Sequence, residues 1–578
     1  MKTSIKNNRG IIFLIAIISG IIFIPFIGNC PLFDWDEINF AECAREMILS
    51  GNYSQVQINY QPFWEKPPFF IWLQAISMNV FGINEFAARL PNAICGIASL
   101  ISVFIIGLRL HSKKFGLIWA LLYCTTLLPH FYFKSGIIDP WFNLFIILSL
   151  YQFYSFLINF ENKKSIINSL FSGLFLGLAV LTKGPVALII FAITIIAYLI
   201  WTKQIKQLGS RNLIVFMITS LIVSASWFIV EWLNGNEKII LEFINYQIRL
   251  FNTEDSGHSG PFLYHFFVLL IGCFPASFIF IASYLKKNNL TNPQKHWRIL
   301  MLCLFWVVLL LFSIVKTKIL HYSSICYFPL TYIAAIGISE YISDFKLNKF
   351  FKFFYWIIAS AIGLSFILIA NINLLKPFII QHQLIADEFA IDCLKADVKW
   401  TGLEFIIGLL FLLGCYLIYI SITRGKEKLF YYGSLTNCFF ICFAISVIVP
   451  KIEQYSQHSN IEFYKHIANK NCYVETRGFK SYAQLFYSNR KPSDYNNPFQ
   501  KKFIIETLNK LEKEGYSKSK TYGLANLIWM QNEIVDRPVY IVIKTKNESE
   551  LLNDNKLHKL YSKNGFSYFE RPFINTAK

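Results

Sequence analysis

The sequence is poor in charged residues and lacks the common cysteine motifs. Only 15% of its 578 residues are charged, while 55% are apolar. Soluble domains average about a quarter charged residues and under half apolar ones, so a soluble globular fold is excluded for most of the chain. No Cys-x-x-Cys pair and no Cys/His group at zinc-finger spacing occurs among the 12 cysteines. Those inside apolar runs are interpreted as small core residues: Cys95, Cys124, Cys273, Cys303, Cys415, Cys438 and Cys442.

Acidic residues are scarce relative to basic ones, with 35 Asp and Glu against 54 Lys and Arg. In a soluble protein this excess would suggest binding to nucleic acid. Here the basic residues lie in short hinges between apolar runs long enough to cross a bilayer. We therefore expect a lipid bilayer, and no nucleic acid, as a partner.

The apolar runs predict about thirteen membrane spans in the first 450 residues, near 11–28, 87–108, 115–133, 140–158, 167–181, 185–201, 212–232, 262–285, 297–315, 322–341, 351–371, 402–422 and 430–450. The first run follows Lys2, Lys6 and Arg9 and lacks a cleavage pattern, so it is interpreted as a retained helix with a cytoplasmic N-terminus. Every alternate hinge is basic, and the odd count places the C-terminus outside. If the two predicted spans on either side of Thr182–Pro185 were instead a single broken helix, the predicted orientation of every later span would be reversed.

The chain divides at the end of its apolar runs. Residues 1–450 are predicted to form a multi-span transmembrane domain whose outer-side loop, 29–86, is the first of three long outer segments, the others being 233–261 and 372–400. Residues 451–578 are predicted to form a small soluble α/β domain, with strands at 472–476 and 538–544 and helices at 480–488 and 503–515. This domain contains no nucleotide-binding loop, and we expect no nucleotide cofactor.

Ionisable residues near the membrane mark candidate functional positions because they are costly there. Those predicted on the outer side are Asp36, Glu37, Glu65, Lys66, Asp139, Lys183, His258, Lys316, Lys318 and His321. They come from separate connections yet share one face. This favours an enzyme at the outer interface over a transporter, whose polar groups are expected near the midplane.

Four of these residues lie in the outer-side loop 29–86, as two adjacent pairs. Asp36 and Glu37 begin a predicted amphipathic interfacial helix, where an acidic residue faces a catalytic cavity or simply caps the helix. Glu65 and Lys66 precede two prolines that fix an extended backbone. A fixed lysine suits a lipid phosphate, and the alternative is a surface salt bridge of little value.

The remaining candidates lie at predicted turns. Lys183 occupies a Thr-Lys-Gly-Pro turn, and Lys316 and Lys318 precede His321 at a span end. Snorkelling explains many such lysines, but these two are on the side that positive-inside topology disfavours, which indicates ligand binding. His258 and Glu65 are suitable metal ligands, although two ligands alone do not define a site.

Together these motifs resemble one family. They are, in order, Asp36-Glu37, Ala41-Glu42, Ala44-Arg45-Glu46-Met47, Glu65-Lys66-Pro67-Pro68, Asp139-Pro140, Thr182-Lys183-Gly184-Pro185, His258 with Gly260-Pro261-Phe262, and Lys318 with His321-Tyr322. The chain is similar to the aminoarabinose transferases of lipid A, within the protein-mannosyltransferase-like group of GT-C glycosyltransferases. The resemblance is strongest over roughly the first 330 residues.

The resemblance implies a membrane α-helical GT-C fold in the bacterial inner membrane, with a periplasmic C-terminal domain. The implied reaction moves an amino sugar from an undecaprenyl-phosphate donor to a lipid A phosphate, with inversion. The implied catalytic residues are Asp36, Glu37 and Asp139. The implied substrate-binding residues are Lys66, Lys183, Lys316, Lys318, His321, Tyr322 and Arg45. Glu65 with His258 matches the family's position for a divalent, zinc-like metal ion.

Two departures from the family pattern leave the sugar open. The family's Asp-Glu-x-Arg-Tyr is here Asp-Glu-Ile-Asn-Phe at 36–40, and the proline-rich stretch expected after Tyr322 is Ser-Ser-Ile-Cys-Tyr-Phe-Pro at 323–329. Aminoarabinose and a hexosamine such as galactosamine are both compatible with the sequence. The nearest alternative is a protein O-glycosyltransferase of the same fold, and the alternatives in other classes are a lipid transporter and a structural membrane protein.

Overall fold

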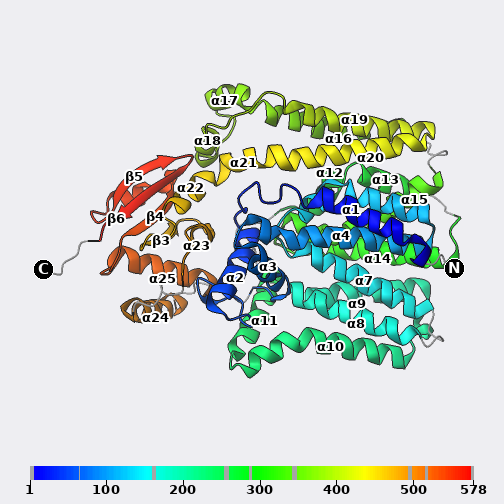
Figure 1. Ribbon diagram of the computed structural model, residues 1–578, viewed down its shortest axis with the longest axis horizontal. Coiled ribbons are helices and arrows are strands. Elements are labelled where there is room, and N and C mark those ends of the chain that lie inside the picture. Colours follow the sequence, from blue (N-terminus) through cyan, green and yellow to red (C-terminus); the bar gives the residue numbers. More distant parts are fainter. Residues whose placement is uncertain are drawn as a thin grey trace.

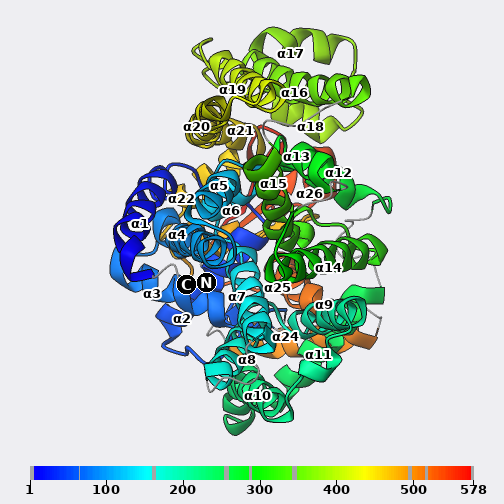
Figure 2. The same ribbon diagram turned by 90° about the vertical axis from the view of Figure 1, so that its right-hand side faces the viewer.

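The computed structural model describes residues 5–63, 65–158, 164–252, 260–284, 289–341, 348–491, 498–513 and 518–573. Long, roughly parallel helices form most of the molecule, and a small sheet domain lies at one end of them (Figure 1). Seen nearly end-on, two helices of the later part of the chain form a separate layer along one side of the bundle (Figure 2). They are α16 (Lys349–Ala370) and α19 (Phe405–Arg424).

Each of the thirteen predicted spans coincides with a helix or a bent helix pair. The other helices of the bundle are α1 (Arg9–Phe23), α4 (Glu85–Leu110), α5 (Lys113–Cys124), α6 (Leu127–Phe133), α7 (Asp139–Ile158), α8 (Lys164–Lys183), α9 (Val186–Thr202), α10 (Ser210–Leu233), α12 (Tyr264–Gly272), α13 (Ala276–Tyr284), α14 (Asn292–Ile314), α15 (Tyr327–Tyr341) and α20 (Glu427–Phe443). Within the described ranges, 10 helices are long and apolar enough to cross a membrane, or up to 12 if the two bent pairs α5–α6 and α12–α13 each count as one span. The remaining predicted span, α9, is a shorter apolar helix of 17 residues.

The outer faces of the bundle are apolar, as lipid contact requires. On α10, Leu221, Ile222 and Leu233 are 67%, 63% and 72% exposed. Exposed apolar surface of this extent is expected in a bilayer, where lipid tails replace water. The chain is therefore a multi-pass membrane protein.

The turn after Lys183 separates two helices. Gly184 has a φ of +88°, a conformation that glycine adopts without strain, and α9 begins two residues later. Helices α8 and α9 contact one another and lie alongside each other (Figures 1 and 2). The structure thus has two helices here, as the span prediction required, and not one broken helix.

Several short elements lie on the side of the sheet domain. They are α2 (Asp36–Ser50), β1 (Gln57–Ile58), β2 (Gln61–Pro62), α3 (Phe69–Phe81), α11 (Glu237–Asn252), η3 (Leu320–Cys326), α17 (Ile372–Gln381) and α18 (Glu388–Leu394). Helix α2 starts where predicted, but it is buried on nearly all sides, and its polar residues Glu42, Arg45 and Glu46 are fully buried. The expectation of a helix with one polar, solvated face is wrong because the C-terminal domain covers that face.

The C-terminal domain contains a four-stranded sheet in the order β3-β4-β6-β5. Strands β3 (Tyr473–Arg477) and β4 (Val539–Lys544) are parallel, with Tyr473 opposite Val539. Strands β5 (His558–Lys563) and β6 (Phe566–Arg571) form an antiparallel hairpin, and β6 pairs antiparallel with β4. Around the sheet lie α21 (Val449–Ser456), α22 (His458–His466), α23 (Ala483–Tyr487), α24 (Pro498–Lys513), α25 (Lys518–Asn532) and α26 (Ser549–Leu552).

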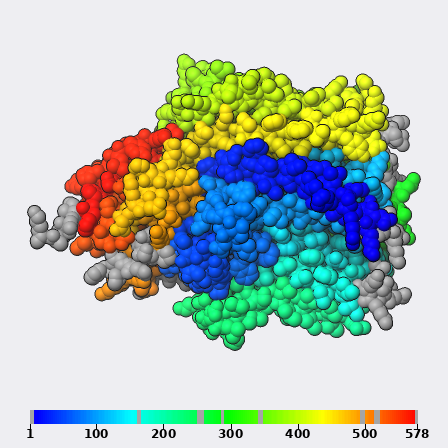
Figure 3. Space-filling view, viewed as in Figure 1, coloured from blue at the N-terminus to red at the C-terminus, as the bar shows by residue number. Residues whose placement is uncertain are grey.

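The two predicted strands are confirmed as β3 and β4, and the predicted α/β domain is present. The helix expected at 480–488 is shorter, and the hairpin of β5 and β6 was not predicted. No linker separates the two predicted domains at residue 450. Helix α20 instead continues through a π-helical turn at Ala444–Ile448 into α21. The C-terminal domain also shares one apolar core with α2 and α3, which includes Phe40, Phe70 and Tyr568. In Figure 3 the blue surface of the early chain is continuous with the orange surface of this domain.

Candidate active site

Two carboxylates and a histidine meet where the helices face the sheet domain. His321 Nε2 lies 3.3 Å from Asp36 Oδ2 and 3.6 Å from Asp139 Oδ2. Lys183 Nζ lies 2.5 Å from the other oxygen of Asp139. Four predicted site residues, from α2, α7, α8 and η3, are thus neighbours in space, and they form what we call the outer cluster: Asp36, Asp139, Lys183 and His321.

Asp36 is the most accessible carboxylate of the outer cluster. Its side chain is 37% exposed, whereas that of Asp139 is 1% exposed. Asp36 is the first residue of α2 and follows Trp35, whose φ of +77° is strained for a bulky residue. Strain of this kind is typical of functional positions, where the surrounding structure holds an unfavourable backbone. It fixes the entry into α2 and hence the direction of Asp36.

Lys183 is held by a carboxylate and two aromatic rings. Besides its contact with Asp139, its Nζ lies 5.0 Å from the ring centre of Tyr322 and 5.4 Å from that of Phe142. Aromatic faces attract a cation without neutralising it. Among the residues that the structure describes, none forms a hydrogen bond with Oδ2 of Asp139, and His321 Nε2 is 3.6 Å away. The outer cluster therefore retains polar capacity for a ligand.

Lys66 and Glu65 border the outer cluster. Lys66 interacts electrostatically with Asp139 and His321, and its Nζ lies 5.6 Å from the ring centre of Tyr246 on α11. Glu65 accepts a hydrogen bond of 3.2 Å from the Tyr246 hydroxyl and lies 3.8 Å from Nζ of Lys480 in the C-terminal domain. The Glu65-Lys66 pair thus lies between α11, the C-terminal domain and the outer cluster.

Glu37 lies next to Asp36 but has its bonding capacity filled. Its carboxylate forms a two-pronged ion pair with Arg89 of α4, at 2.7 Å for each oxygen. It also accepts the backbone N–H groups of Phe33 and Gly136, at 2.8 and 2.5 Å. These bonds tie the start of α2 to α4 and to the loop before Asp139. Glu37 therefore positions the two carboxylates of the outer cluster. Both of its own oxygens already accept hydrogen bonds, so the structure offers no support for its predicted catalytic role.

Arg89 was absent from the candidate residues, although an available signal pointed to it. It lies inside a predicted span, where an ionised residue is rare. It is 4% exposed, and it donates further bonds to the carbonyls of Ile27, Cys30 and Pro31. Arg89 therefore holds the start of the outer-side loop as well as Glu37.

Arg45, a predicted substrate-binding residue, lies apart from the outer cluster. It is fully buried, pairs with Glu42 at 2.5 Å and donates to the carbonyl of Arg490 at 2.7 Å. Glu46, one residue on, accepts the N–H groups of Asn59 and Tyr60 at 2.6 and 2.7 Å, and its burial raises the pKa of its carboxyl. Arg45 thus docks α2 against the C-terminal domain.

The two lysines before His321 have different environments. Lys318 is 5% exposed and donates to the carbonyls of Phe312, Ser313 and Val315, at 3.0, 2.7 and 2.6 Å. A cation at these orphan carbonyls stabilises the end of α14. This helix-end role explains why a lysine lies on the predicted outer side, and no bound ligand is needed to explain it. Lys316 is exposed and remains a predicted substrate contact.

The predicted metal position is described only in part, because His258 lies outside the described residues. Among the residues that the structure describes, three or more Cys, His, Asp or Glu ligand atoms gather only at Cys124, His130 and Cys438, and not at Glu65. The carboxylate of Glu65 instead faces a lysine and a phenol. Metal binding by Glu65 and His258 therefore stays a prediction, and no chemical step is derived through it.

Comparisons with known proteins agree with this architecture. Residues 65–229 match the family described as dolichyl-phosphate-mannose-protein mannosyltransferase. The chain is 27% identical over 335 residues to an undecaprenyl phosphate-alpha-4-amino-4-deoxy-L-arabinose arabinosyl transferase of Photorhabdus laumondii, covering 57% of the chain and 60% of that protein. It is 29% identical over 346 residues to the one of Wigglesworthia glossinidia brevipalpis, covering 58% and 61%. The chain thus matches about 60% of the length of these curated relatives.

The fold is shared over a larger part of the chain. The crystal structure of ArnT from Cupriavidus metallidurans bound to undecaprenyl phosphate superimposes with a TM-score of 0.71 at 14% identity, covering 98% of both chains. The apo structure of the same protein gives 0.70. The chain is therefore similar in sequence to the undecaprenyl phosphate aminoarabinose arabinosyl transferases over part of its length, and it shares the fold of ArnT over nearly all of it.

Proposed function

We propose that the chain transfers an amino sugar from an undecaprenyl-phosphate donor to a phosphate of lipid A. The observation that carries the proposal is the outer cluster, where His321 links the accessible carboxylate of Asp36 to Asp139. Asp139 in turn faces the cation of Lys183 and interacts electrostatically with Lys66. The names of the curated relatives support the same donor and the same class of sugar. The sugar is 4-amino-4-deoxy-L-arabinose or a hexosamine such as galactosamine.

The charges suit the bond that must break. As the bond between sugar C1 and the donor phosphate oxygen breaks, the electron pair stays with polyprenyl phosphate and its negative charge grows. Lys66 and Lys183 stabilise that charge more in the transition state than in the ground state. The sugar becomes positive at C1, and the Asp36 carboxylate stabilises it. An ionised phosphate oxygen of the acceptor then bonds C1 from the opposite face, which inverts the configuration.

The acceptor phosphate is already ionised and needs no base, so the role of Asp36 is to stabilise the positive charge at sugar C1 and to orient the sugar. His321 contacts both Asp36 and Asp139, and this bridge holds the accessible carboxylate in place. The ion pair of Glu37 with Arg89 fixes the backbone at the start of α2, next to Asp36. A hydroxyl acceptor, in contrast, would require Asp36 to remove a proton.

An apolar cavity suits the lipid part of the donor. A cavity of about 370 Å³ lies between α12, α13, α14 and α15. Its lining residues are Phe266, Leu269, Leu270, Ser277, Phe280, Ile281, Tyr284, Phe305, Trp306, Leu309 and Leu330. A polyisoprenoid chain matches such a lining because it carries no polar group. His265, next to Phe266, contacts Ser323 near His321, which places one end of this region close to the outer cluster.

The proposed setting is the bacterial inner membrane, with a cytoplasmic N-terminus and a periplasmic C-terminal domain. The basic hinges support this orientation, since Lys114 and the start of α20 lie at the end opposite the sheet domain. A cysteine introduced at exposed Asn553 tests it, because the native cysteines are largely buried. A membrane-impermeant thiol reagent added from the periplasm is expected to label it, and labelling only after the membrane is opened would overturn the orientation.

The decisive experiment is mass spectrometry of lipid A from cells with and without the gene. We expect an added mass that vanishes on deletion, returns with the wild-type gene and does not return with Asp36→Asn. The size of the mass distinguishes a pentose amine from a hexosamine. Unchanged lipid A in cells that make both the protein and a polyprenyl-phosphate sugar would overturn the proposal.

A second candidate is a protein O-glycosyltransferase. It is favoured by the description of the family that matches residues 65–229. Sugar-dependent mass shifts on periplasmic peptides, with lipid A unchanged, would identify it.

A further inference from the structure

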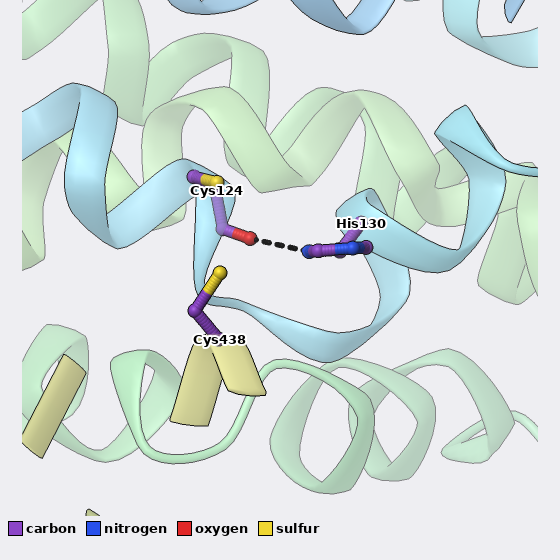
Figure 4. A group of neighbouring side chains, drawn as sticks. All are labelled: Cys124, His130 and Cys438. Carbon is purple, nitrogen blue, oxygen red and sulfur yellow. Dashed lines mark hydrogen bonds between the residues drawn. The ribbon is translucent and has the colours of Figure 1, made fainter. Parts of the chain in front are cut away.

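Three side chains with soft metal-ligand atoms meet inside the helix bundle. Cys124 ends α5, His130 lies on α6 and Cys438 lies on α20, and their ligand atoms all lie within 4.8 Å of one another (Figure 4). All three are buried, at 5%, 0% and 6% exposure. One turn further along α20, Cys442 places its Sγ 3.9 Å from His130 Nε2. We call these four residues the thiol cluster.

The course of two helices brings the thiol cluster together. Helices α5 and α20 start side by side, with Lys114 Nζ 2.7 Å from Glu427 Oε2. Cys124 and Cys438 lie about 15 Å further along their helices, at 1.5 Å per residue. They therefore reach the same depth. The chain then bends by 74° between α5 and α6, which brings the ring of His130 back against Cys124.

The hydrogen bond of His130 presents the nitrogen that a metal needs. Its Nδ1 lies 2.9 Å from the carbonyl oxygen of Cys124. A carbonyl only accepts, so Nδ1 carries the proton and Nε2 keeps its lone pair. Metal-ligating histidines are commonly oriented in this way, with the second ring nitrogen donating to a carbonyl. Nε2 is also the nitrogen that faces Cys442.

A buried lysine balances the charge of the thiol cluster. Lys134 is 7% exposed, donates to the carbonyl of Pro25 at 2.8 Å and interacts electrostatically with Cys124, Cys438 and Cys442. A divalent ion bound by three thiolates carries one net negative charge, and the lysine cation neutralises it. Neutrality matters here because an unbalanced charge is costly in an apolar interior.

We propose that Cys124, His130, Cys438 and Cys442 bind one zinc ion in a closed, tetrahedral site. Thiolate and imidazole are the ligands of structural zinc, at about 2.3 and 2.0 Å, which sets ligand atoms roughly 3.5 Å apart. The ligand atoms of Cys124, His130 and Cys438 lie within 4.8 Å of one another and Cys442 Sγ lies 3.9 Å from His130 Nε2, so zinc binding requires the four side chains to draw together. Zinc enters as the three thiols lose their protons to solvent, and the four ligands leave no open position for substrate.

The zinc ion would cross-link two parts of the bundle. It joins the bend between α5 and α6 to α20, and α20 leads through α21 into the C-terminal domain. The site is separate from the metal position of Glu65 and His258, and it does not depend on the proposed glycosyl transfer. Its role is to stabilise the structure.

The test uses the full chain purified in mild detergent. We expect about one zinc ion per chain by elemental analysis, and cobalt(II) exchanged into the protein is expected to give the intense thiolate-to-cobalt absorption of a tetrahedral site. Cys124→Ala with Cys438→Ala is expected to abolish both signals. Cys303→Ala with Cys415→Ala is the matched control, because it removes two other buried cysteines. Glu65→Ala should leave the cobalt–thiolate absorption unchanged.

Cys442→Ala provides a milder second variant, because Cys442 is only partly buried. It should keep the fold while shifting the cobalt spectrum toward fewer thiolates. The proposal is overturned if the wild-type chain, titrated with zinc or cobalt under reducing conditions, binds no ion through thiolate. It is equally overturned if the variant lacking Cys124 and Cys438 gives the same cobalt spectrum as the wild type.

Discussion

Two groups of buried charge at the outer end of the helices differ in how completely they are bonded. In the Glu37–Arg89 pair, both carboxylate oxygens and the guanidinium nitrogens all have partners. In the outer cluster, Oδ2 of Asp139 accepts no hydrogen bond from the described part of the chain, and His321 lies between it and the partly exposed Asp36. Buried polar groups are normally satisfied, and an exception calls for an explanation. The saturated pair builds the site, and the unsaturated cluster is where we expect the substrate.

Breaking the saturated pair should have the largest effect. Arg89→Met leaves the Glu37 carboxylate buried without its cation, and losing one partner of such a pair costs about 3–5 kcal/mol of unfolding free energy. Thermal unfolding and the yield of folded protein in detergent measure it. Removing both charges, with Glu37→Gln and Arg89→Met together, should restore most of the stability. An Arg89→Met protein as stable as the wild type would contradict this view of the pair.

Breaking the unsaturated cluster should reduce activity but not stability. Asp36→Asn is expected to lower sugar transfer by about 10²-fold or more, since it removes charge stabilisation at the reacting carbon. Its unfolding midpoint should stay near that of the wild type because Asp36 is partly exposed. Mass spectrometry of the modified acceptor measures transfer. Glu388→Gln, at an exposed acidic residue on α18, is the control. Unimpaired transfer by Asp36→Asn would remove Asp36 from the site.

A third buried carboxylate sharpens the comparison, because its partners are neutral. Glu475 accepts bonds from Gln484 and Asn526, and burial raises its pKa from 4.5 to about 7. Below pH 4.5 the Glu475 carboxyl is protonated in both the folded and the unfolded chain, so its full contribution to the free energy of unfolding is present. Between pH 4.5 and 7 only the unfolded chain loses the proton, so stability falls as the pH rises.

Glu475→Gln should therefore stabilise the chain at pH 8, by at most roughly 3 kcal/mol, and have little effect near pH 4.5. Denaturant unfolding followed by fluorescence of the C-terminal domain at the two pH values measures this difference. An equal effect of the substitution at both pH values would show that the Glu475 proton does not control stability.

The smallest effect is expected at Lys316, which is exposed and stays a predicted substrate contact. Lys316→Ala should raise the KM for the donor about threefold, leave kcat unchanged and lose its effect at high salt, because exposed charges are screened. Steady-state transfer at two ionic strengths measures it. Lys399→Ala, at another exposed outer lysine, is the control. A large loss of kcat would instead place Lys316 at the reacting phosphate.

The spans and the composition of the outer cluster were predictable from the sequence. Apolar runs of bilayer length fix the helices almost without tertiary information. Asp36, Asp139, Lys183 and His321 were expected to share one face because ionised residues near the membrane are rare. Their contacts confirm that they are neighbours, while their roles in catalysis stay predictions.

What sequence reasoning missed depends on partners far along the chain. Nothing near Arg45 indicates that Arg490 will cover it, and α2 therefore looked like an interfacial helix. Cys124 and Cys438 have no local spacing that identifies a thiol cluster. The β5–β6 hairpin, in contrast, had a local signal, since Asn564-Gly565 is a preferred tight-turn pair and both residues have positive φ.

The helix from Glu427 to Ser456 is unbroken, so the last span and the start of the C-terminal domain move together as one rigid rod. At 1.5 Å per residue its 30 residues extend about 45 Å, so a tilt of about 10° at the membrane end moves the other end by about 8 Å. That end is anchored to the domain whose Lys480 approaches Glu65. A change in bilayer thickness that tilts the span would therefore displace Lys480 relative to Glu65, which borders the outer cluster.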